Sequence, residues 1–309
     1  MKTAKNVAEL NKIHDEAMKR SFRFSLEQME KELGPPPCEF SWFLVGSGGR
    51  REQAKISDQD HGMIFRSNHK EAEHYFLLLG KEVSKGLNIL GYPYCEGNVM
   101  SSNSLWCQSE QKWIEQIQKW LSEETFDSIR YLLIFFDARK IFGTFDPLKK
   151  LKQFYFDHLA KQPSFLKRLL NNTMHVKKAI GVFHQFLPET YGPHAGAIDL
   201  KQTGLLPYVN SIRLLAIKEQ ITETSTLSRF EALIHQKGLG DLLSPYYQSF
   251  QELLTIHFVN SLKADRYSEV HYLFLKNVSK EEKKMLKQIF LNGKKLMNDT
   301  VTMIEKGVE

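Results

Sequence analysis

The segment from residue 40 to residue 65 constrains the fold of this chain most strongly. Residues 40–45 (Phe-Ser-Trp-Phe-Leu-Val) are aromatic and β-branched, which predicts a strand. This strand leads directly into a glycine-rich turn at residues 46–49. After a polar stretch, residues 58–65 are predicted to form a second strand. The first half of the chain is therefore expected to contain a small mixed sheet.

Most of the remaining sequence predicts helices, because apolar residues recur at steps of three and four. Proline removes an N–H donor and fixes φ, so the run at residues 34–37 (Gly-Pro-Pro-Pro) ends the first amphipathic stretch. The apolar run at residues 131–136 is too short to decide between strand and helix. The segments predicted to be helical are residues 6–33, 71–90, 105–121, 165–186, 204–220, 227–236, 246–263 and 280–304.

Together these elements predict an α+β fold in three parts. N-terminal helices occupy residues 1–35, a small mixed-sheet domain residues 36–146, and an all-helical C-terminal bundle residues 147–309. The chain has 309 residues, of which 42% are hydrophobic. That is an ordinary globular composition and enough for two cores, so disordered and fibrous classes are excluded.

Charge and cysteine content restrict the possible partners. The formal net charge of +6 is thin for a nucleic-acid-binding surface. The three cysteines, Cys38, Cys95 and Cys107, lack the short paired spacing of zinc sites, so we expect reduced thiols in a cytoplasmic protein. The longest strongly apolar run is far below the roughly 18 residues that span a bilayer, and we expect no membrane span or targeting signal.

Two carboxylates open the second predicted strand. Residues two apart on a strand leave the same face about 7 Å apart, so Asp58 and Asp60 can share a metal ion. Unpaired carboxylates about 4 Å apart would repel by roughly 4 kcal/mol at an effective dielectric constant of about 20. Mg²⁺ is expected to remove this repulsion, since it takes carboxylate and phosphate oxygens as ligands. A turn or a solvated strand end is the alternative for an isolated Asp-x-Asp.

The glycine-rich turn complements such a metal. Glycine lets the backbone approach an anion closely, and the N–H groups after Ser47 at a helix start favour phosphate. By itself the turn is equally consistent with a flexible loop. With two aspartates after ten intervening residues, between two strands, it predicts a site for metal-bound phosphates.

This combination resembles the signature of the DNA polymerase β-like nucleotidyltransferase superfamily. The fuller string, Gly-Ser-x-Gly-Arg-x-Glu followed by Ser-Asp-Gln-Asp, resembles the branch that contains PII-protein uridylyltransferase and glutamine-synthetase adenylyltransferase. It is most similar to an uncharacterised nucleotidyltransferase-like family that is often fused to CBS and cyclic-nucleotide-binding domains. Residues 91–100, 135–139 and 199–207 also resemble blocks of that family.

The resemblance implies a two-metal nucleotidyl transfer in the mixed-sheet domain. Gly46 and Ser47 would hold the β- and γ-phosphates of a nucleoside triphosphate, and Asp58 and Asp60 would bind two Mg²⁺ ions. Asp137 would complete the metal site and help to activate the attacking hydroxyl. A helix or strand cap is the alternative for Asp137.

Four further residues receive roles at the nucleotide site from the resemblance. Arg50 would contact the triphosphate and Glu52 would orient Arg50 or the loop, with a surface ion pair as the alternative for both. Arg139 belongs to an Asp-x-Arg pattern like that of the adenylyltransferases. Lys201 would reach a phosphate or the base, with a polar loop as the alternative.

The function expected from this resemblance is Mg²⁺-dependent transfer of UMP or AMP to a hydroxyl of a protein, with release of pyrophosphate. A PII-like protein is the expected type of acceptor. A nucleotide-sensing or partner-binding regulator without turnover is the alternative from a different class. Nucleotide addition to RNA is disfavoured, because no Lys/Arg cluster is interleaved with aromatic residues. The chain also lacks a His-Asp phosphohydrolase motif, so no removal activity is expected.

Overall fold

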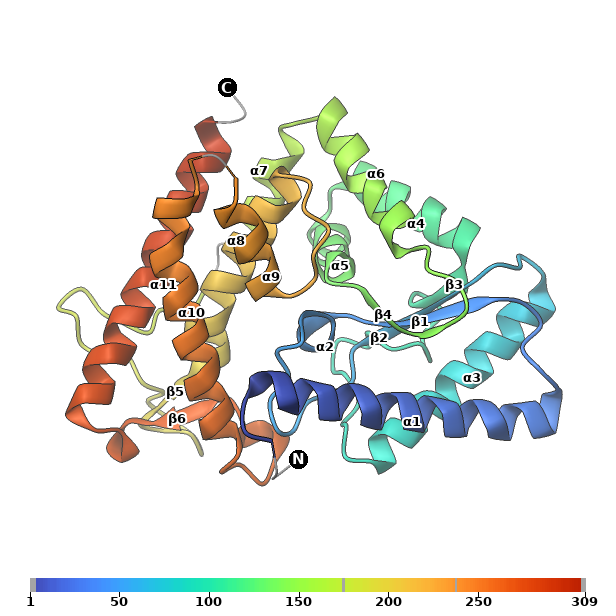
Figure 1. Cartoon of the computed structure of the whole chain (residues 1–309), viewed down its shortest axis with the longest axis horizontal. Coiled ribbons are helices and arrows are strands. Elements are labelled where there is room, and N and C mark those ends of the chain that lie inside the picture. Colours follow the sequence, from blue (N-terminus) through green and yellow to red (C-terminus); the bar gives the residue numbers. More distant parts are fainter. Residues whose placement is uncertain (1–3, 174–175, 237, 307–309) are drawn as a thin grey trace. The chain divides into compact units, whose positions relative to one another are not determined.

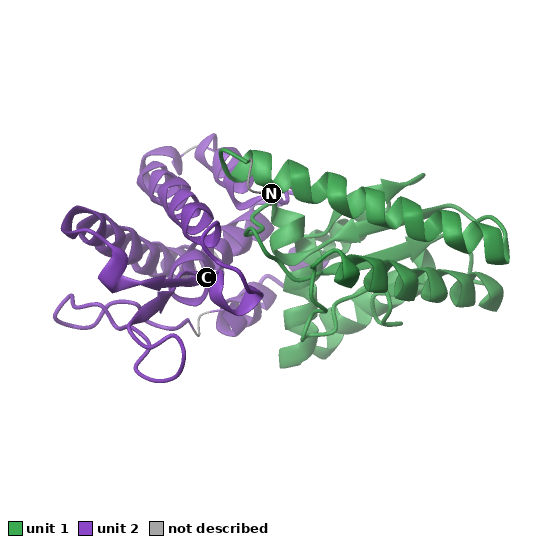
Figure 2. Ribbon diagram, turned by 90° about the horizontal axis from the view of Figure 1, so that it is seen from below, with its two compact units in different colours: residues 1–157 green, residues 158–309 purple. Residues whose placement is uncertain are grey.

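The computed structural model describes residues 4–173, 176–236 and 238–306. The chain forms two compact units, residues 1–157 and 158–309 (Figure 2). The predicted α+β fold is confirmed, because the first unit contains a small mixed sheet and the second is mainly helical. The domain boundaries after residues 35 and 146 stay predictions.

The sheet of the first unit has four strands in the order β3-β2-β1-β4. β1 runs antiparallel to both β2 and β4, whereas β2 and β3 are parallel. Leu44 pairs with His61, so the end of β1 lies beside the start of β2. The glycine-rich turn and the aspartates therefore meet at one end of the sheet. The strands are β1 (Phe40–Leu44), β2 (His61–Phe65), β3 (Cys107–Ser109) and β4 (Arg139–Gly143).

Helices cover both faces of this sheet, with α1 and α3 on one side and α4 and α5 on the other (Figure 1). The alternation of β1 explains the two layers. Trp42 stacks on Phe22 of α1 at 4.6 Å between ring centroids, while Phe43 points the other way and packs against Trp113 and Phe135. The helices are α1 (Val7–Leu33), α2 (Gly46–Arg50), α3 (Lys70–Ile89), α4 (Glu110–Glu123), α5 (Phe126–Phe136) and α6 (Leu148–Lys161).

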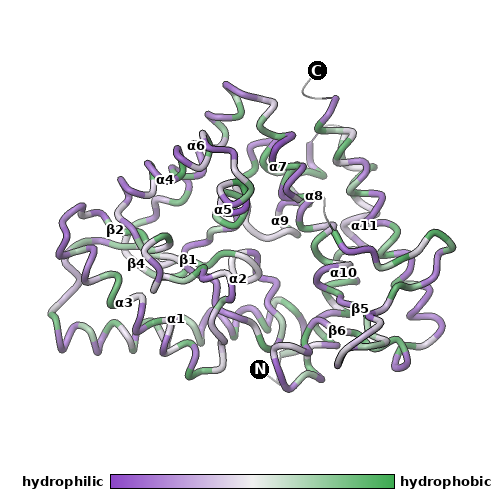
Figure 3. Tube along the Cα trace, turned by 180° about the vertical axis from the view of Figure 1, so that it is seen from behind, coloured by the Kyte–Doolittle hydropathy of each residue, from purple (hydrophilic) through white to green (hydrophobic). Residues whose placement is uncertain are grey.

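The first helix follows the sequence signals closely. The Asn6 side chain accepts the Glu9 N–H at 2.9 Å and caps the N-terminus of α1. Gly34, with φ of 82°, ends the helix before the prolines. Between these caps, hydrophilic and hydrophobic positions alternate along the trace of α1 (Figure 3), as expected for a helix with one face on a core.

The second unit is a helical bundle built around α8. This helix is buried on nearly all sides and packs against α7, α9 and α11. The bundle prediction did not include the two-stranded sheet formed by β5 and β6. The elements are α7 (Phe165–Thr173), β5 (Ala197–Asp199), η1 (Lys201–Leu205), α8 (Leu206–Lys218), α9 (Thr226–Ile234), α10 (Gly240–Ser261), η2 (Tyr267–Glu269), β6 (Tyr272–Phe274), η3 (Leu275–Asn277) and α11 (Lys280–Lys306).

Two predicted helices differ from the structure, and the structure decides one segment that the sequence left open. The helix predicted for residues 105–121 starts only at Glu110, because residues 107–109 pair with β2 as a strand. The ambiguous run at residues 131–136 is the end of helix α5. The helix predicted for residues 165–186 ends at Thr173, and residues 180 and 186 instead form an antiparallel bridge around a turn. Residues 174–175 lie outside the described part.

Within the described ranges, the helices are too short or too polar for any of them to cross a bilayer.

Candidate functional site

The site begins where β1 ends and the short helix α2 starts. The N–H of Val45, the residue before α2, donates to the Asp60 carbonyl at 3.0 Å and ties the turn to the aspartate segment. The next three amides, of residues 46–48, form the first turn of α2, where N–H groups have no partner within a helix. The Ser47 hydroxyl lies 3.5 Å from the hydroxyl of Ser57. This end of the sheet therefore offers backbone and hydroxyl donors for an anion.

Gly46 is required at its position for two independent reasons. Its φ of 55° lies in the left-handed region, which side chains other than glycine rarely adopt. A Cβ atom there would also come within 2.6 Å of Oδ2 of Asp60. The glycine thus lets the backbone turn directly against the Asp60 carboxylate.

The structure brings Asp58 and Asp60 together and adds Cys95. One ligand atom from each of the three half-buried residues lies within 4.8 Å of the others. Burial, reinforced by the Asp60 carboxylate, raises the pKa of the Cys95 thiol to about 12, so without a metal the thiol donates to Asp60. Sequence reasoning did not select Cys95, although it lies in the block at residues 91–100 that supported the resemblance.

Gln59, between the two aspartates, and His61, directly after them, form buried hydrogen bonds that hold this segment in place. Gln59 and His61 point away from the carboxylates and are fully buried. The Gln59 amide donates to the carbonyls of Ser84 and Tyr92, both at 3.0 Å, and Gln59 Oε1 bonds His61 Nε2 at 3.0 Å. Nδ1 of His61 accepts the Ser101 N–H at 3.2 Å. Because one ring nitrogen accepts a backbone N–H, the other carries the proton and His61 is neutral.

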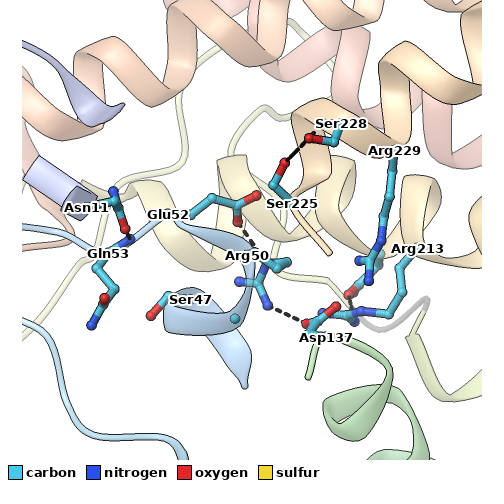
Figure 4. A network of polar contacts seen from close by, with 12 residues as sticks. Asn11, Ser47, Arg50, Glu52, Gln53, Asp137, Arg213, Ser225, Ser228 and Arg229 are labelled. Carbon is cyan, nitrogen blue, oxygen red and sulfur yellow. Dashed lines mark hydrogen bonds and ion pairs between the residues drawn. The ribbon is translucent and has the colours of Figure 1, made fainter. Parts of the chain in front are cut away.

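Arg50 and Asp137 form a buried ion pair beside α2 (Figure 4). Nη1 of Arg50 donates to Oδ2 of Asp137 at 2.6 Å, and its Nε donates to Oε2 of Glu52 at 2.8 Å. Burial lowers the pKa of Arg50, but the two carboxylates outweigh this effect and raise it, so the guanidinium stays charged. Arg50 and Glu52 are buried partners, not the surface pair considered from the sequence.

Asp137 occupies the position after α5, as the C-cap residue. Among the residues that the structure describes, it is not part of the group of potential metal ligands around Asp60. Its carbonyl oxygen touches the position that a Cβ on Gly49 would fill. The backbone of Asp137 therefore packs against α2 at Gly49. Its role in the metal site stays a prediction.

Arg139 holds the glycine-rich helix from its C-terminal end. Its guanidinium donates to the carbonyls of Gly48 and Gly49 at 2.8 and 3.2 Å, and both of its terminal nitrogens bond Asp15 of α1 at 2.8 and 2.9 Å. Such a bidentate pair fixes direction as well as distance. These contacts assign Arg139 to the support of α2, and its predicted contact with nucleotide stays a prediction.

Lys201 belongs to the second unit and opens the π-helical turn η1. Oδ1 of Asp199 accepts the N–H groups of Lys201 and Gln202, both at 2.9 Å. Two histidines stack nearby: burial, and next the charge of Lys201, lower the pKa of His257 to about 4 and of His271 to about 2. Irregular helical turns of this kind are frequent at functional sites.

The chemistry of the donor set fits a divalent metal. Two carboxylates and a thiol converge from one side, and the backbone of Gly46 leaves the Asp60 carboxylate room that a side chain would fill. In the described residues this is the one cluster of three or more such ligands. The first-turn amides of α2 and the Ser47 hydroxyl lie on the segment of Gly46 and suit the phosphates that accompany such a metal.

Two family models match most of the chain. The model described as "Putative nucleotidyltransferase DUF294" matches residues 1–127, and the model described as "Putative nucleotidyltransferase substrate binding domain" matches residues 163–302. Among curated protein sequences, none matches this chain at a significant level.

Proposed function

We propose that this chain, which belongs to the DUF294 family of nucleotidyltransferases, moves UMP or AMP from a nucleoside triphosphate to a hydroxyl group of a protein. Transfer of a nucleotidyl group follows from the family. The donor base, the protein acceptor, the need for Mg²⁺ and a role in cytoplasmic signalling are the proposed parts.

The convergence of Asp58, Asp60 and the first turn of α2 at one end of the sheet carries this proposal. A bound divalent metal would neutralise phosphate charge and orient the phosphates for in-line attack. Asp58 and Asp60 would hold it, in the arrangement of two Mg²⁺ ions that the resemblance implies. The chain itself has little covalent chemistry to perform, because this reaction depends on positioning and electrostatics.

The residues around the turn would bind and position the triphosphate. The amides of residues 46–48 and the Ser47 hydroxyl would donate to phosphate oxygens. Arg139 would keep α2 in place by donating to its carbonyl groups. Arg50 would stabilise the same helix through its ion pairs with Glu52 and Asp137. Lys201 remains the proposed contact of the second unit with a phosphate or the base, in line with its place in the matched substrate-binding domain.

The acceptor is proposed from the resemblance to the uridylyl- and adenylyltransferases, whose substrates are proteins of nitrogen control. A PII-like protein is the expected type of acceptor. The helical unit would contribute to its recognition, since the matched model of that region describes substrate binding.

Mass spectrometry after incubation with each of the four nucleoside triphosphates and Mg²⁺ tests this proposal. Lysate proteins are scanned for nucleotidyl additions, with the Asp58→Asn variant as the matched control. Addition of one nucleotide, dependent on Asp58, supports the proposal. Tight binding of a non-hydrolysable triphosphate with no modified protein would instead favour a nucleotide-sensing regulator.

A further inference from the structure

We infer that Cys95 is a metal ligand, so that the Asp58–Asp60 site binds borderline divalent metals such as Mn²⁺, Co²⁺ and Zn²⁺ through sulfur and prefers them to Mg²⁺. This inference rests on the proposed function for the location of the metal. It adds a sulfur ligand to the proposed site and predicts which divalent ions bind there most tightly.

The position of Cys95 is built into the backbone. The loop that carries it is fastened to the aspartate segment on both sides of Asp60: the Gln59 N–H donates to the Pro93 carbonyl at 3.1 Å, and the His61 N–H donates to the Val99 carbonyl at 3.0 Å. Between these two bonds, the Asn98 N–H donates to the Cys95 carbonyl at 2.9 Å and closes the turn. These backbone bonds therefore place the Cys95 loop beside the aspartate segment, and the thiol lies close to both carboxylates.

The spacing of the three ligand atoms suits a single ion. They lie within 4.8 Å of one another, and ligands with tetrahedral bonds of about 2.0–2.3 Å lie roughly 3.5 Å apart. Small side-chain rotations close this difference. All three residues are half-buried, so an ion can reach them from solvent.

The chemistry of sulfur sets the expected preference. Mg²⁺ takes oxygen ligands and holds its waters, whereas thiolate favours softer ions, with affinity rising from Mn²⁺ to Co²⁺. When the metal binds, the thiol loses its proton to solvent and the metal–sulfur bond replaces the hydrogen bond to Asp60.

The other two cysteines provide internal controls. Cys38 is half-buried and its sulfur accepts the Ser67 N–H at 3.4 Å, while Cys107 is buried in β3. Neither belongs to a group of potential metal ligands within the described ranges. Cys38→Ser removes a thiol of similar exposure without touching the site.

Titration of the apo-protein with Co²⁺ tests the inference, with absorption spectra and calorimetry recorded together. Sulfur ligation produces an intense thiolate-to-cobalt charge-transfer band in the near ultraviolet. We expect this band in the wild type and in Cys38→Ser, and its loss in Cys95→Ser with at least a tenfold weaker Co²⁺ affinity. The Mg²⁺ affinity of Cys95→Ser should change less than threefold.

Co²⁺ binding without the band, or a band that survives in Cys95→Ser, would overturn the inference. Circular dichroism and thermal melting of each variant exclude misfolding as the cause of a lost band. A separate transfer assay tests the proposed function. Nucleotidyl transfer by Cys95→Ser with Mg²⁺ would support that function even if the sulfur does not bind metal. Loss of transfer in Asp58→Asn but not in Cys95→Ser would bear on the proposed function and not on the sulfur ligand.

Discussion

The backbone of Gly46 lies directly against the carboxylate of Asp60, with 2.6 Å between Oδ2 and the position of a Cβ on residue 46. A side chain at residue 46 would therefore have to displace the Asp60 carboxylate. In the proposed function this contact would set the position of the phosphate-binding turn relative to a metal held by Asp60, and nucleotidyl transfer depends on such positioning.

Gly46→Ala should therefore weaken metal binding and abolish transfer. The alanine must adopt a φ of 55° and displace the Asp60 carboxylate, and the backbone strain alone costs about 1–3 kcal/mol of stability. Calorimetric titration with Mn²⁺ and urea unfolding measure the two effects. Gly34→Ala is the matched control, because Gly34 has a φ of 82° but nothing within 4 Å. It should lose stability and keep metal affinity, and equal metal affinity in both variants would contradict this account.

Arg50→Met should destabilise the first unit by about 3–5 kcal/mol, because it removes the buried guanidinium that pairs with both Asp137 and Glu52. Urea unfolding followed by tryptophan fluorescence gives this free energy. Lys112→Met, which breaks a pair with Glu73 at the surface, should cost less than about 1 kcal/mol. Similar losses in the two variants would show that the Arg50 pair is not a structural element of the site.

Stability should fall as pH is lowered from 6.5, in part because of His61. Burial lowers its pKa to about 3 in the folded protein, from 6.5 in the unfolded chain. Between these values the unfolded chain binds a proton that the folded protein does not, so the contribution of His61 is complete above pH 6.5 and is lost towards pH 3.

His61→Gln should reduce the slope of unfolding free energy against pH by up to ~1.4 kcal/mol per pH unit between pH 6 and 4. Urea unfolding at several pH values measures the slope. His74→Gln, at an exposed position, is the matched control. An unchanged slope in His61→Gln would mean that the folded protein accepts the proton at this position.

Local signals made much of the fold predictable. The start of α1 follows from the Asn6 cap, and its end from Gly34 and the prolines after it. The aromatic run at residues 40–45 likewise predicts strand β1. The glycine-rich turn followed by Asp-x-Asp also predicted a candidate site, and the structure places Asp58, Asp60 and the turn close together. These features depend on neighbours in the chain, which a sequence displays directly.

Features that depend on distant partners were not predictable. Arg50 reaches Asp137 across 87 residues, and Cys95 faces Asp60 only because its loop bonds to the residues on both sides of that aspartate. Strand β3 is stabilised by its parallel pairing with β2. Because that partner is distant in the sequence, the local apolar spacing predicts a helix for these residues. In residues 176–186 the apolar spacing continues without a helix, because the chain forms a turn around Gly181 instead.

Nucleotidyl transfer by Asp58→Asn is the most direct test of the central claim. The substitution keeps the size of the side chain and removes one metal-binding charge, so the fold should be unchanged. With Mg²⁺, an α-labelled nucleoside triphosphate and lysate protein, we expect transfer by the wild type and at least a 10²-fold loss in the variant. Transfer by Asp58→Asn at the wild-type rate would contradict the assignment of this site as the centre of catalysis.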